Sequence, residues 1–253
     1  MTKDTEIRPN AKRAMYSCAF MILACGAGFA ETGLDAVFDR RIASARATSG
    51  VPSVSVAFVR DGQIIYAKAF GKADLASNRG ADPNTIYPIG SITKQFVAAA
   101  VLLLQEAGRL SLEDKVERYL PDLRHAKQVT IRNLLSQTSG YEDYAYQDYL
   151  LSEWTIPIAI PELLARAANN PLAFRPGTAW QYSNTNYSIA GVIVEKASGA
   201  SLHEYLNERI FDPLQMKTAG ACRPGLRGRV TGYVRHALGP SRPAGVEALG
   251  VGD

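Results

Sequence analysis

Cysteine and histidine are scarce in this chain of 253 residues, which has three of each. Two of the cysteines precede residue 30, in a segment with the layout of a cleaved leader, which leaves Cys222. A single cysteine supports neither a disulfide framework nor a cysteine-ligated metal site. The histidines offer no ligand spacing, since they are scattered as His125, His203 and His236. The sequence therefore implies no metal and no cofactor.

A dense basic stripe is also absent. The formal net charge is +4, charged residues make up 21% of the chain, and the arginines are spread along it rather than interleaved with aromatic residues. We therefore predict no nucleic-acid partner. The one local cluster, Arg223, Arg227 and Arg229, is typical of a solvated loop, with a binding patch as the alternative.

The N-terminal apolar run, AMYSCAFMILACGAGFA, is too short and too rich in small residues for a clear membrane span. Basic residues precede it, which is the layout of a secretory signal cleaved after Ala30. An uncleaved anchor is one alternative, and a lipoprotein with Cys25 in its cleavage box is another. We interpret residues 1–30 as a signal peptide or anchor. The protein is then expected to be exported, periplasmic or secreted, with no membrane contact beyond such an anchor.

What the sequence does contain is enough apolar residues to build a core, since 47% of the chain is hydrophobic. Residues 34–47 predict an amphipathic helix with Arg40, Arg41 and Arg46 facing outward. Two β-rich runs follow, VPSVSVAFVR and QIIYAKAFG, and the dipeptide Asp61-Gly62 separates them. Such a pattern predicts a β-hairpin, with strands over residues 54–59 and 63–70.

The remainder of the chain reads as mainly helical. Ser111 with Asp114 and Ser201 with Glu204 have the spacing of helix capping boxes. Thr130 is placed to cap a further helix, and Pro161 suits a first helical position. A strand pair followed by many helices predicts an α+β fold rather than a doubly wound sheet.

The stretch SITKQF joins a serine and a lysine at the beginning of a predicted helix. Ser91 and Lys94 lie three residues apart, so both side chains point the same way from a helical turn. Every residue from Phe96 to Leu104 is apolar, which predicts a helix buried on nearly all sides, and Gly108 is a natural end for it. The alternative is that Lys94 simply extends to solvent from a helix end.

A serine hydroxyl is a weak nucleophile until a base removes its proton, and no motif places a histidine for that task. A lysine can serve where burial and nearby positive charge favour its neutral form, and so can a tyrosine held as phenolate by cations. Tyr182-Ser183-Asn184 offers a phenol and a carboxamide on one short loop. The alternative interpretation is a buried tyrosine beside a helix-capping asparagine.

Taken together, these pieces resemble the serine β-lactamase and penicillin-binding-protein superfamily, in its class C, D-Ala-D-Ala carboxypeptidase and family VIII esterase branch. The similarity runs over residues 50–233. It is carried by YPIGSITKQF, LLSQTSGY and FRPGTAWQYSNTNYSIAGVIVEKASG, in that order. The resemblance implies an antiparallel sheet flanked by helices and a mainly helical lobe, within a hydrolase domain spanning residues 31–235.

The resemblance also implies roles for single residues. Ser91 would be the acylated nucleophile, and Lys94 would be its hydrogen-bonded activator. Tyr182 would act as general base and later as general acid. Asn184 would bind the amide of the substrate and orient Lys94. The backbone N–H of Ser91 would supply one oxyanion donor, aided by the helix N-terminus.

Two features depart from the family pattern. Its third motif, a Lys or His followed by a small residue and Gly, is not found, because His236-Ala237-Leu238 comes too soon and lacks the glycine. The later strands of the sheet are also not found, and residues 236–253 read as an irregular tail. We therefore expect the C-terminal part of the sheet and the second oxyanion donor to be missing. The hairpin should then present an unpaired edge and an uncovered apolar face, with self-association as a consequence.

Two functions remain open at this point. One is a serine hydrolase that acts on a small-molecule or peptidoglycan-peptide substrate: a β-lactam, a D-Ala-D-Ala peptide or an ester. The other is an inactive fragment or binding module of the same fold, without a complete oxyanion hole. A Ser-His-Asp hydrolase is excluded, because Ser91 lacks the Gly-x-Ser-x-Gly elbow.

Overall fold

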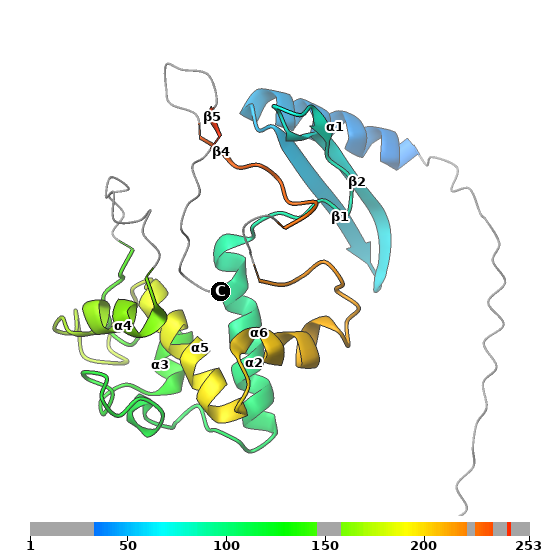
Figure 1. Ribbon diagram of the computed structural model, residues 1–253. Coiled ribbons are helices and arrows are strands. Elements are labelled where there is room, and N and C mark those ends of the chain that lie inside the picture. The colour runs from blue at the N-terminus through cyan, green and yellow to red at the C-terminus, as the bar shows by residue number, and fades with distance from the viewer. Residues whose placement is uncertain (1–32, 146–157, 222–225, 235–241, 244–253) are drawn as a thin grey trace, which may run out of the picture. The chain divides into compact units, whose positions relative to one another are not determined.

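The structure is a computed structural model that describes residues 33–145, 158–221, 226–234 and 242–243. The chain forms two units, residues 1–41 and 42–253. The strands and helices occupy separate parts of the sequence, which is the predicted α+β class (Figure 1). The main elements are α1 (Gly33–Ser49), β1 (Ser53–Arg60), β2 (Gln63–Asp74), β3 (Arg79–Gly80), α2 (Thr93–Glu106), α3 (Ile131–Leu135), α4 (Ile160–Ala168), α5 (Asn184–Ser198), α6 (Leu202–Leu206), β4 (Tyr233–Val234) and β5 (Arg242–Pro243).

The predicted hairpin is confirmed. Strands β1 and β2 pair antiparallel, and Asp61 and Gly62 form the turn with φ angles of 51° and 74°. A two-residue turn with both φ angles positive matches the right-handed twist of the strands it joins. Strand β2 continues to Asp74, beyond the predicted end at residue 70, and pairs with the short β3. The sheet order is therefore β1-β2-β3 in the part of the chain that the structure describes.

Much of the hairpin's apolar surface is exposed. Only Tyr66 and Ala73 are buried in these strands, whereas Val59, Ile64 and Ile65 are exposed. The exposed apolar surface agrees with the expectation from the sequence. Self-association through it stays a prediction.

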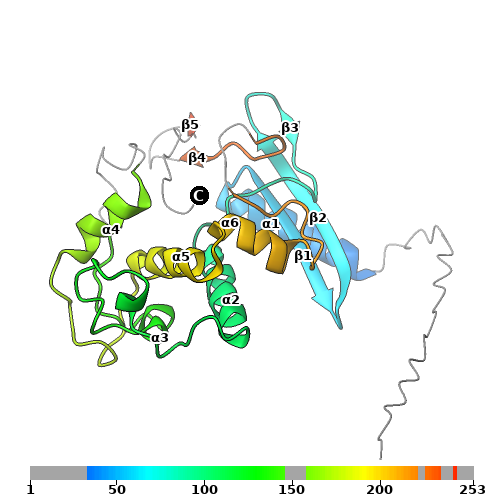
Figure 2. The same ribbon diagram turned by 60° about the horizontal axis from the view of Figure 1, so that its bottom comes forward.

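The hydrophobic core lies among the helices that follow the sheet. Helix α2 packs against α5 and α6, and α3 and α4 also contact α5 (Figures 1 and 2). In α2 the buried residues are Val97, Ala100, Val101 and Leu104, which recur with the helical period. Leu102 is 43% exposed, so the prediction that this helix is buried on nearly all sides is wrong. A helix whose residues are all apolar is buried only where other elements pack against it. The helices that contact α2 leave the side with Leu102 exposed to solvent.

Most predicted helix ends are confirmed. Gly108 has a φ of 67° just beyond α2, as predicted for the residue that ends this helix. Gly199 has the same left-handed conformation just beyond α5, with a φ of 80°. The Thr130 hydroxyl accepts from the Asn133 N–H at 3.2 Å at the beginning of α3. The Ser201 hydroxyl caps α6 through a capping box with Glu204.

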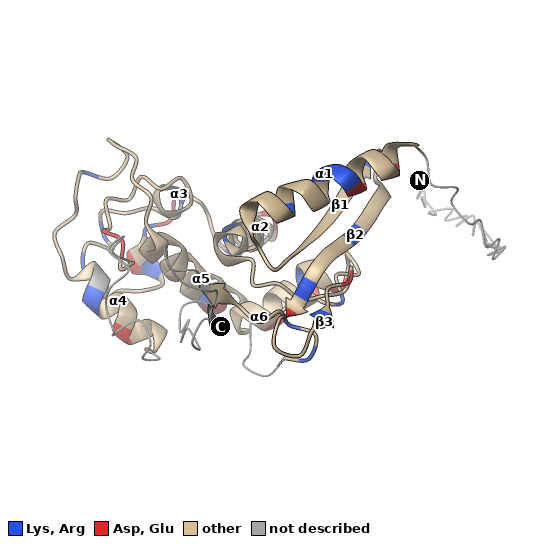
Figure 3. Ribbon diagram, turned by 90° about the horizontal axis from the view of Figure 1, so that it is seen from above, with Lys and Arg blue, Asp and Glu red and all other residues tan. Residues whose placement is uncertain are grey.

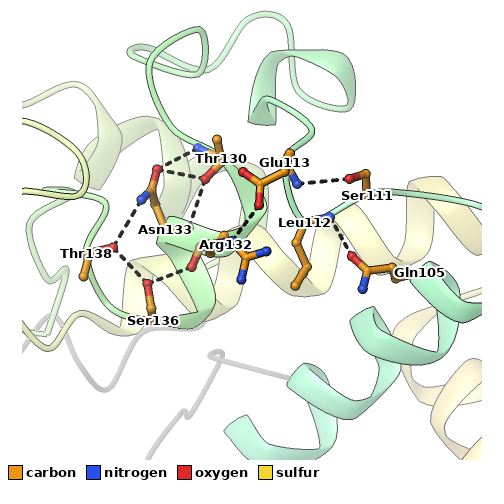
Figure 4. Close-up of polar contacts among 9 residues, drawn as sticks. All are labelled: Gln105, Ser111, Leu112, Glu113, Thr130, Arg132, Asn133, Ser136 and Thr138. Atoms are coloured by element: carbon orange, nitrogen blue, oxygen red, sulfur yellow. Dashed lines mark hydrogen bonds and ion pairs between the residues drawn. The ribbon is translucent and has the colours of Figure 1, made fainter.

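The prediction of a helix after Ser111 is wrong. The Ser111 N–H does donate to the Asp114 carboxylate at 2.9 Å, but within a turn. Lys115 is extended and forms a β-bridge with Thr130, which draws the chain away from a helical path. Figure 4 shows how side chains fasten this segment: Arg132 pairs with Glu113 at 2.6 Å, and the Gln105 side chain accepts from the Leu112 N–H at 2.9 Å.

Helix α1 matches its predicted bounds to within two residues, but none of its residues is buried, so the predicted apolar stripe is not confirmed. Arg40 and Arg41 are exposed as predicted, whereas Arg46 is half-buried. Its guanidinium lies 3.5 Å from the carbonyl oxygens of Val51 and Pro52, which explains why it does not face outward.

Helices α1 and α4 carry charges of both signs (Figure 3). On α4, Arg166 pairs with Glu162 at 2.7 Å. Across the described ranges, no helix has the length and apolar character needed to cross a membrane. The same ranges hold no group of three or more His, Cys, Asp or Glu side chains arranged for a metal ion.

Some predictions fall outside the described residues. These are the segment 1–30, Arg223, and His236 with most of the tail that follows it. Within the predicted irregular tail, β5 pairs antiparallel with β4 through two residue pairs, Tyr233 with Pro243 and Val234 with Arg242.

Candidate active site

Ser91 lies in a single 3₁₀ turn, Gly90–Ile92, that leads directly into α2. Gly90 precedes it with a φ of 52°, a left-handed conformation that favours glycine. Lys94 follows one turn later on α2, and its Nζ donates to Ser91 Oγ at 3.1 Å. The lysine is half-buried and directed at the serine, so the alternative in which it merely extends to solvent does not describe it.

Tyr182 and Asn184 come from the beginning of α5, about ninety positions later in the sequence. The Tyr182 hydroxyl lies 2.7 Å from Ser91 Oγ and 3.1 Å from Asn184 Oδ1. Asn184 Oδ1 also accepts from Lys94 Nζ at 2.6 Å. The structure thus brings all four predicted site residues into one hydrogen-bonded cluster.

The alternative interpretation of the Tyr182 loop is wrong in both parts. Tyr182 is 39% exposed rather than buried. Ser183, not Asn184, occupies the N-cap position of α5, and its side chain makes no capping hydrogen bond. Asn184 is the first helical residue, which leaves its carboxamide available to the cluster.

Two tyrosine rings lie beside the lysine. Lys94 Nζ lies 4.9 Å from the ring centroid of Tyr182 and 5.7 Å from that of Tyr187. Such contacts with ring faces stabilise a cation. Burial raises the pKa of Tyr187, and burial also raises the pKa of Tyr144 to about 12, with the Asp143 charge acting in the same direction. These two phenols are therefore held protonated, and Tyr182 is the tyrosine in contact with Ser91.

The loop of residues 137–145 fastens the beginning of α5 through buried polar side chains. Gln137 Oε1 accepts from the Ser183 N–H at 3.0 Å and from Asn186 Nδ2 at 2.6 Å. Ser139 Oγ donates to Asn186 Oδ1 at 2.5 Å. Gln137, Ser139, Ser183 and Asn186 are all buried, and each has a partner here, which satisfies their hydrogen bonding away from water.

Sequence reasoning missed one residue of this site, Asp143. Its carboxylate accepts from the Asn184 N–H at 3.0 Å. It also accepts from Asn184 Nδ2 at 3.2 and 3.1 Å, one distance to each carboxylate oxygen. Asp143 lies two residues beyond the stretch LLSQTSGY that carried the resemblance. Its closeness to that stretch was the one available signal, and no sequence spacing relates it to Asn184.

The arrangement has the parts needed to activate a hydroxyl. Ser91 Oγ is exposed and within hydrogen-bonding distance of both an amine and a phenol, at the N-terminal end of a helix. A serine hydroxyl placed between a lysine and a tyrosine is the arrangement that the sequence predicts for a serine hydrolase without a catalytic histidine. The catalytic roles of the four residues stay predictions.

Comparison with known proteins gives the family. The Beta-lactamase family profile matches residues 38–248, and the chain therefore belongs to the beta-lactamase family. A penicillin-binding protein of Bacillus subtilis is 38% identical over 159 residues, 61% of this chain and 35% of that protein. Esterase EstB of Burkholderia gladioli is 34% identical over 206 residues, 74% of this chain and 50% of that protein.

Solved structures of similar fold also include penicillin-binding proteins. The octameric penicillin-binding protein homologue from Pyrococcus abyssi has a TM-score of 0.73 and 31% identity, with 82% of this chain and 50% of that chain covered. The resemblance and fold inferred from the sequence are thereby confirmed. The chain spans about half or less of the length of these relatives.

Proposed function

We propose that the protein is a serine hydrolase that acts through an acyl-enzyme on Ser91, with a β-lactam, a D-Ala-D-Ala peptide or an ester as substrate. The observation that carries the proposal is the position of Ser91 Oγ, 2.7 Å from the Tyr182 hydroxyl and 3.1 Å from Lys94 Nζ. The relatives support the reaction class, since they include an esterase and a D-aminopeptidase.

The proposed acylation starts with the transfer of the Ser91 proton to the phenolate form of Tyr182. Ser91 Oγ then forms a bond to the carbonyl carbon of the substrate, and the Ser91 N–H at the helix N-terminus donates to the resulting oxyanion. The C–N or C–O bond to the leaving group breaks, and Tyr182 returns the proton to that group. Water then attacks the acyl carbon, releasing the acid and restoring Ser91.

Lys94 and Asn184 assist these reaction steps without forming a covalent bond to the acyl group. The Lys94 ammonium, 3.1 Å from Ser91 Oγ, stabilises negative charge as it develops on that oxygen. Asn184 Oδ1 holds the lysine in place at 2.6 Å. Asn184 is also proposed to bind the amide of the substrate.

We also propose that the protein is exported, periplasmic or secreted. The support is the basic segment followed by an apolar, small-residue run within residues 1–30. Expression of the full chain in a bacterial host, followed by fractionation and N-terminal sequencing, tests this. Recovery of the uncleaved chain from the cytoplasm alone contradicts it.

The catalytic proposal is tested with two acylating probes, a fluorescent penicillin and a fluorophosphonate. We expect wild-type labelling at Ser91, none in Ser91→Ala, and labelling slowed about 10²-fold or more in Tyr182→Phe. Ser198→Ala is the matched control. Among the described residues, the Ser198 hydroxyl bonds only around its own turn, to the Glu195 and Ala200 carbonyl oxygens and the Ala200 N–H.

The outcomes are distinct. Undiminished labelling of Ser91→Ala removes this serine from the nucleophile role, and an unchanged rate in Tyr182→Phe assigns the base role to Lys94. An unlabelled wild-type chain favours the inactive binding module. Turnover of nitrocefin, a D-Ala-D-Ala peptide and p-nitrophenyl acetate then identifies the substrate class.

A further inference from the structure

We propose that Asp143 is a positioning residue that sets which way the Asn184 carboxamide faces, and thereby holds Lys94 against Ser91. The proposal rests on the proposed function, in which Lys94 activates Ser91. It assigns a role in the reaction to a residue outside the serine, lysine, tyrosine and asparagine cluster.

The carboxamide of Asn184 lies between two groups of opposite hydrogen-bonding character. Lys94 is on one side, and its ammonium can only donate. Asp143 is on the other side, and its carboxylate can only accept. Asn184 Oδ1 faces Lys94 Nζ at 2.6 Å, and Asn184 Nδ2 faces the two carboxylate oxygens of Asp143 at 3.2 and 3.1 Å. The amide can satisfy both neighbours in this orientation alone.

Reversing the amide would have two effects on the cluster. Its NH₂ group would oppose the Lys94 ammonium, so Lys94 would lose the 2.6 Å acceptor that holds it in place. Asn184 Oδ1 also accepts from the Tyr182 hydroxyl at 3.1 Å. With the amide reversed, an NH₂ group would face Tyr182 in place of this acceptor, so the hydrogen bond that links Tyr182 to Asn184 Oδ1 would be lost.

Asp143 is itself held firmly enough to set the amide. Its Oδ1 accepts from two backbone N–H groups, those of Ala145 at 3.1 Å and Asn184 at 3.0 Å. The carbonyl of the preceding residue, Glu142, accepts from the hydroxyls of Ser183 at 3.2 Å and Thr185 at 2.7 Å. The backbone of residues 183–185 at the beginning of α5 thus carries the amide and also holds the carboxylate in place.

The backbone contacts of Asp143 and its contact with the amide can be separated by substitution. An asparagine at position 143 keeps one side-chain oxygen, which can still accept from the backbone N–H groups at the beginning of α5. It replaces the other oxygen with an NH₂ group, which opposes Asn184 Nδ2 and favours the reversed amide. Asp143→Asn therefore spares the fold and tests the orientation.

The experiment measures the rate of fluorophosphonate labelling of Ser91 together with the melting temperature. We expect Asp143→Asn to melt close to wild type and to label about 10²-fold more slowly, the scale expected for a misplaced catalytic group. Glu142→Gln is the matched control, because its side chain contacts Asn170 Nδ2 at 3.1 Å, outside the cluster. It should label within about twofold of wild type.

Exchanging the two side chains gives a rescue test. In Asp143→Asn combined with Asn184→Asp, a carboxylate at position 184 accepts from both Lys94 and the new amide at position 143. We expect the double variant to label at least tenfold faster than either single variant, a coupling that independent effects on stability do not produce. A double variant as slow as the slower single variant overturns the proposal.

A second readout does not depend on reactivity. The side-chain NH₂ signal of Asn184 in a ¹⁵N–¹H spectrum is assigned by its loss in Asn184→Asp. It should move in Asp143→Asn and stay in place in Glu142→Gln. If wild type is unlabelled but this signal moves, the proposed function fails and the orientation by Asp143 stands. If wild type is labelled and neither rate nor signal changes in Asp143→Asn, the orientation proposal fails alone.

Discussion

Gly140→Ala is expected to destabilise the protein strongly, for two reasons that the structure separates. Gly140 has a φ of 83°, a left-handed conformation in which a residue with a Cβ is strained by about 1–2 kcal/mol. A Cβ added there would lie 2.3 Å from the backbone oxygen of Phe174 and 3.3 Å from Leu172 Cβ. Relieving such a contact costs about 1–3 kcal/mol more.

The neighbouring backbone has little freedom to move away. The Gly140 carbonyl accepts from the Ala173 N–H at 2.8 Å, and the Gly177 N–H donates to the Thr138 carbonyl at 2.8 Å, so two segments are tied on both sides of the contact. We therefore expect Gly140→Ala to lower the free energy of unfolding by about 2–5 kcal/mol, a large part of the total for a typical domain.

Gly108→Ala is the matched control. Gly108 has a φ of 67°, but a Cβ added there meets no atom within 4 Å, so only the strain contributes, about 1–2 kcal/mol. Urea unfolding followed by circular dichroism gives both free energies under the same conditions. Equal destabilisation by the two substitutions would refute the reasoning. It would mean that the Phe174 backbone moves away from the added Cβ without a loss of free energy of unfolding.

Two further predictions concern stability. Hydrogen bonds from the Thr231 hydroxyl and then from the backbone and hydroxyl of Ser77 lower the pKa of Asp74 from 3.8 to about 2. The stabilisation is present above pH 4 and is lost as the pH falls through 2, so Asp74→Asn should show a smaller drop in melting temperature between pH 5 and 2 than wild type, and an equal drop contradicts this. Ser201→Ala removes the cap of α6 and should cost about 1 kcal/mol in urea unfolding, more than Ser111→Ala, since Ser111 caps no helix; the reverse order would contradict the assignment.

Local chemistry made much of the fold predictable. Asp61-Gly62 specifies a tight turn because both residues tolerate a positive φ, and the flanking β-rich runs then pair. Thr130 and Ser201 cap helices because a hydroxyl at that position accepts a backbone N–H that the helix leaves unpaired. The relation of Ser91 to Lys94 is of the same kind, since one helical turn joins them.

The predictions fail where contacts between segments far apart in the sequence determine the local structure. Ser111 and Asp114 make a hydrogen bond typical of a capping box, but pairing of Lys115 with Thr130 prevents a helix. The exposure of Leu102 depends on which helices surround α2, which its own apolar sequence does not specify. Asp143 meets Asn184 only because the loop of residues 137–145 lies against the beginning of α5, and no spacing in the sequence encodes that contact.

The buried polar contacts of that loop explain how an exposed serine can sit in a well-defined cluster. Ser91 and Tyr182 are at the surface, where side chains ordinarily move freely. Beneath them, Gln137 and Asn186 are buried and bonded to each other, so displacing the beginning of α5 would leave polar groups unpaired away from water. That penalty fixes the backbone that carries Tyr182 and Asn184. The apolar core joins α2 to α5. The buried hydrogen bonds of the loop hold Tyr182 and Asn184 opposite Ser91 and Lys94.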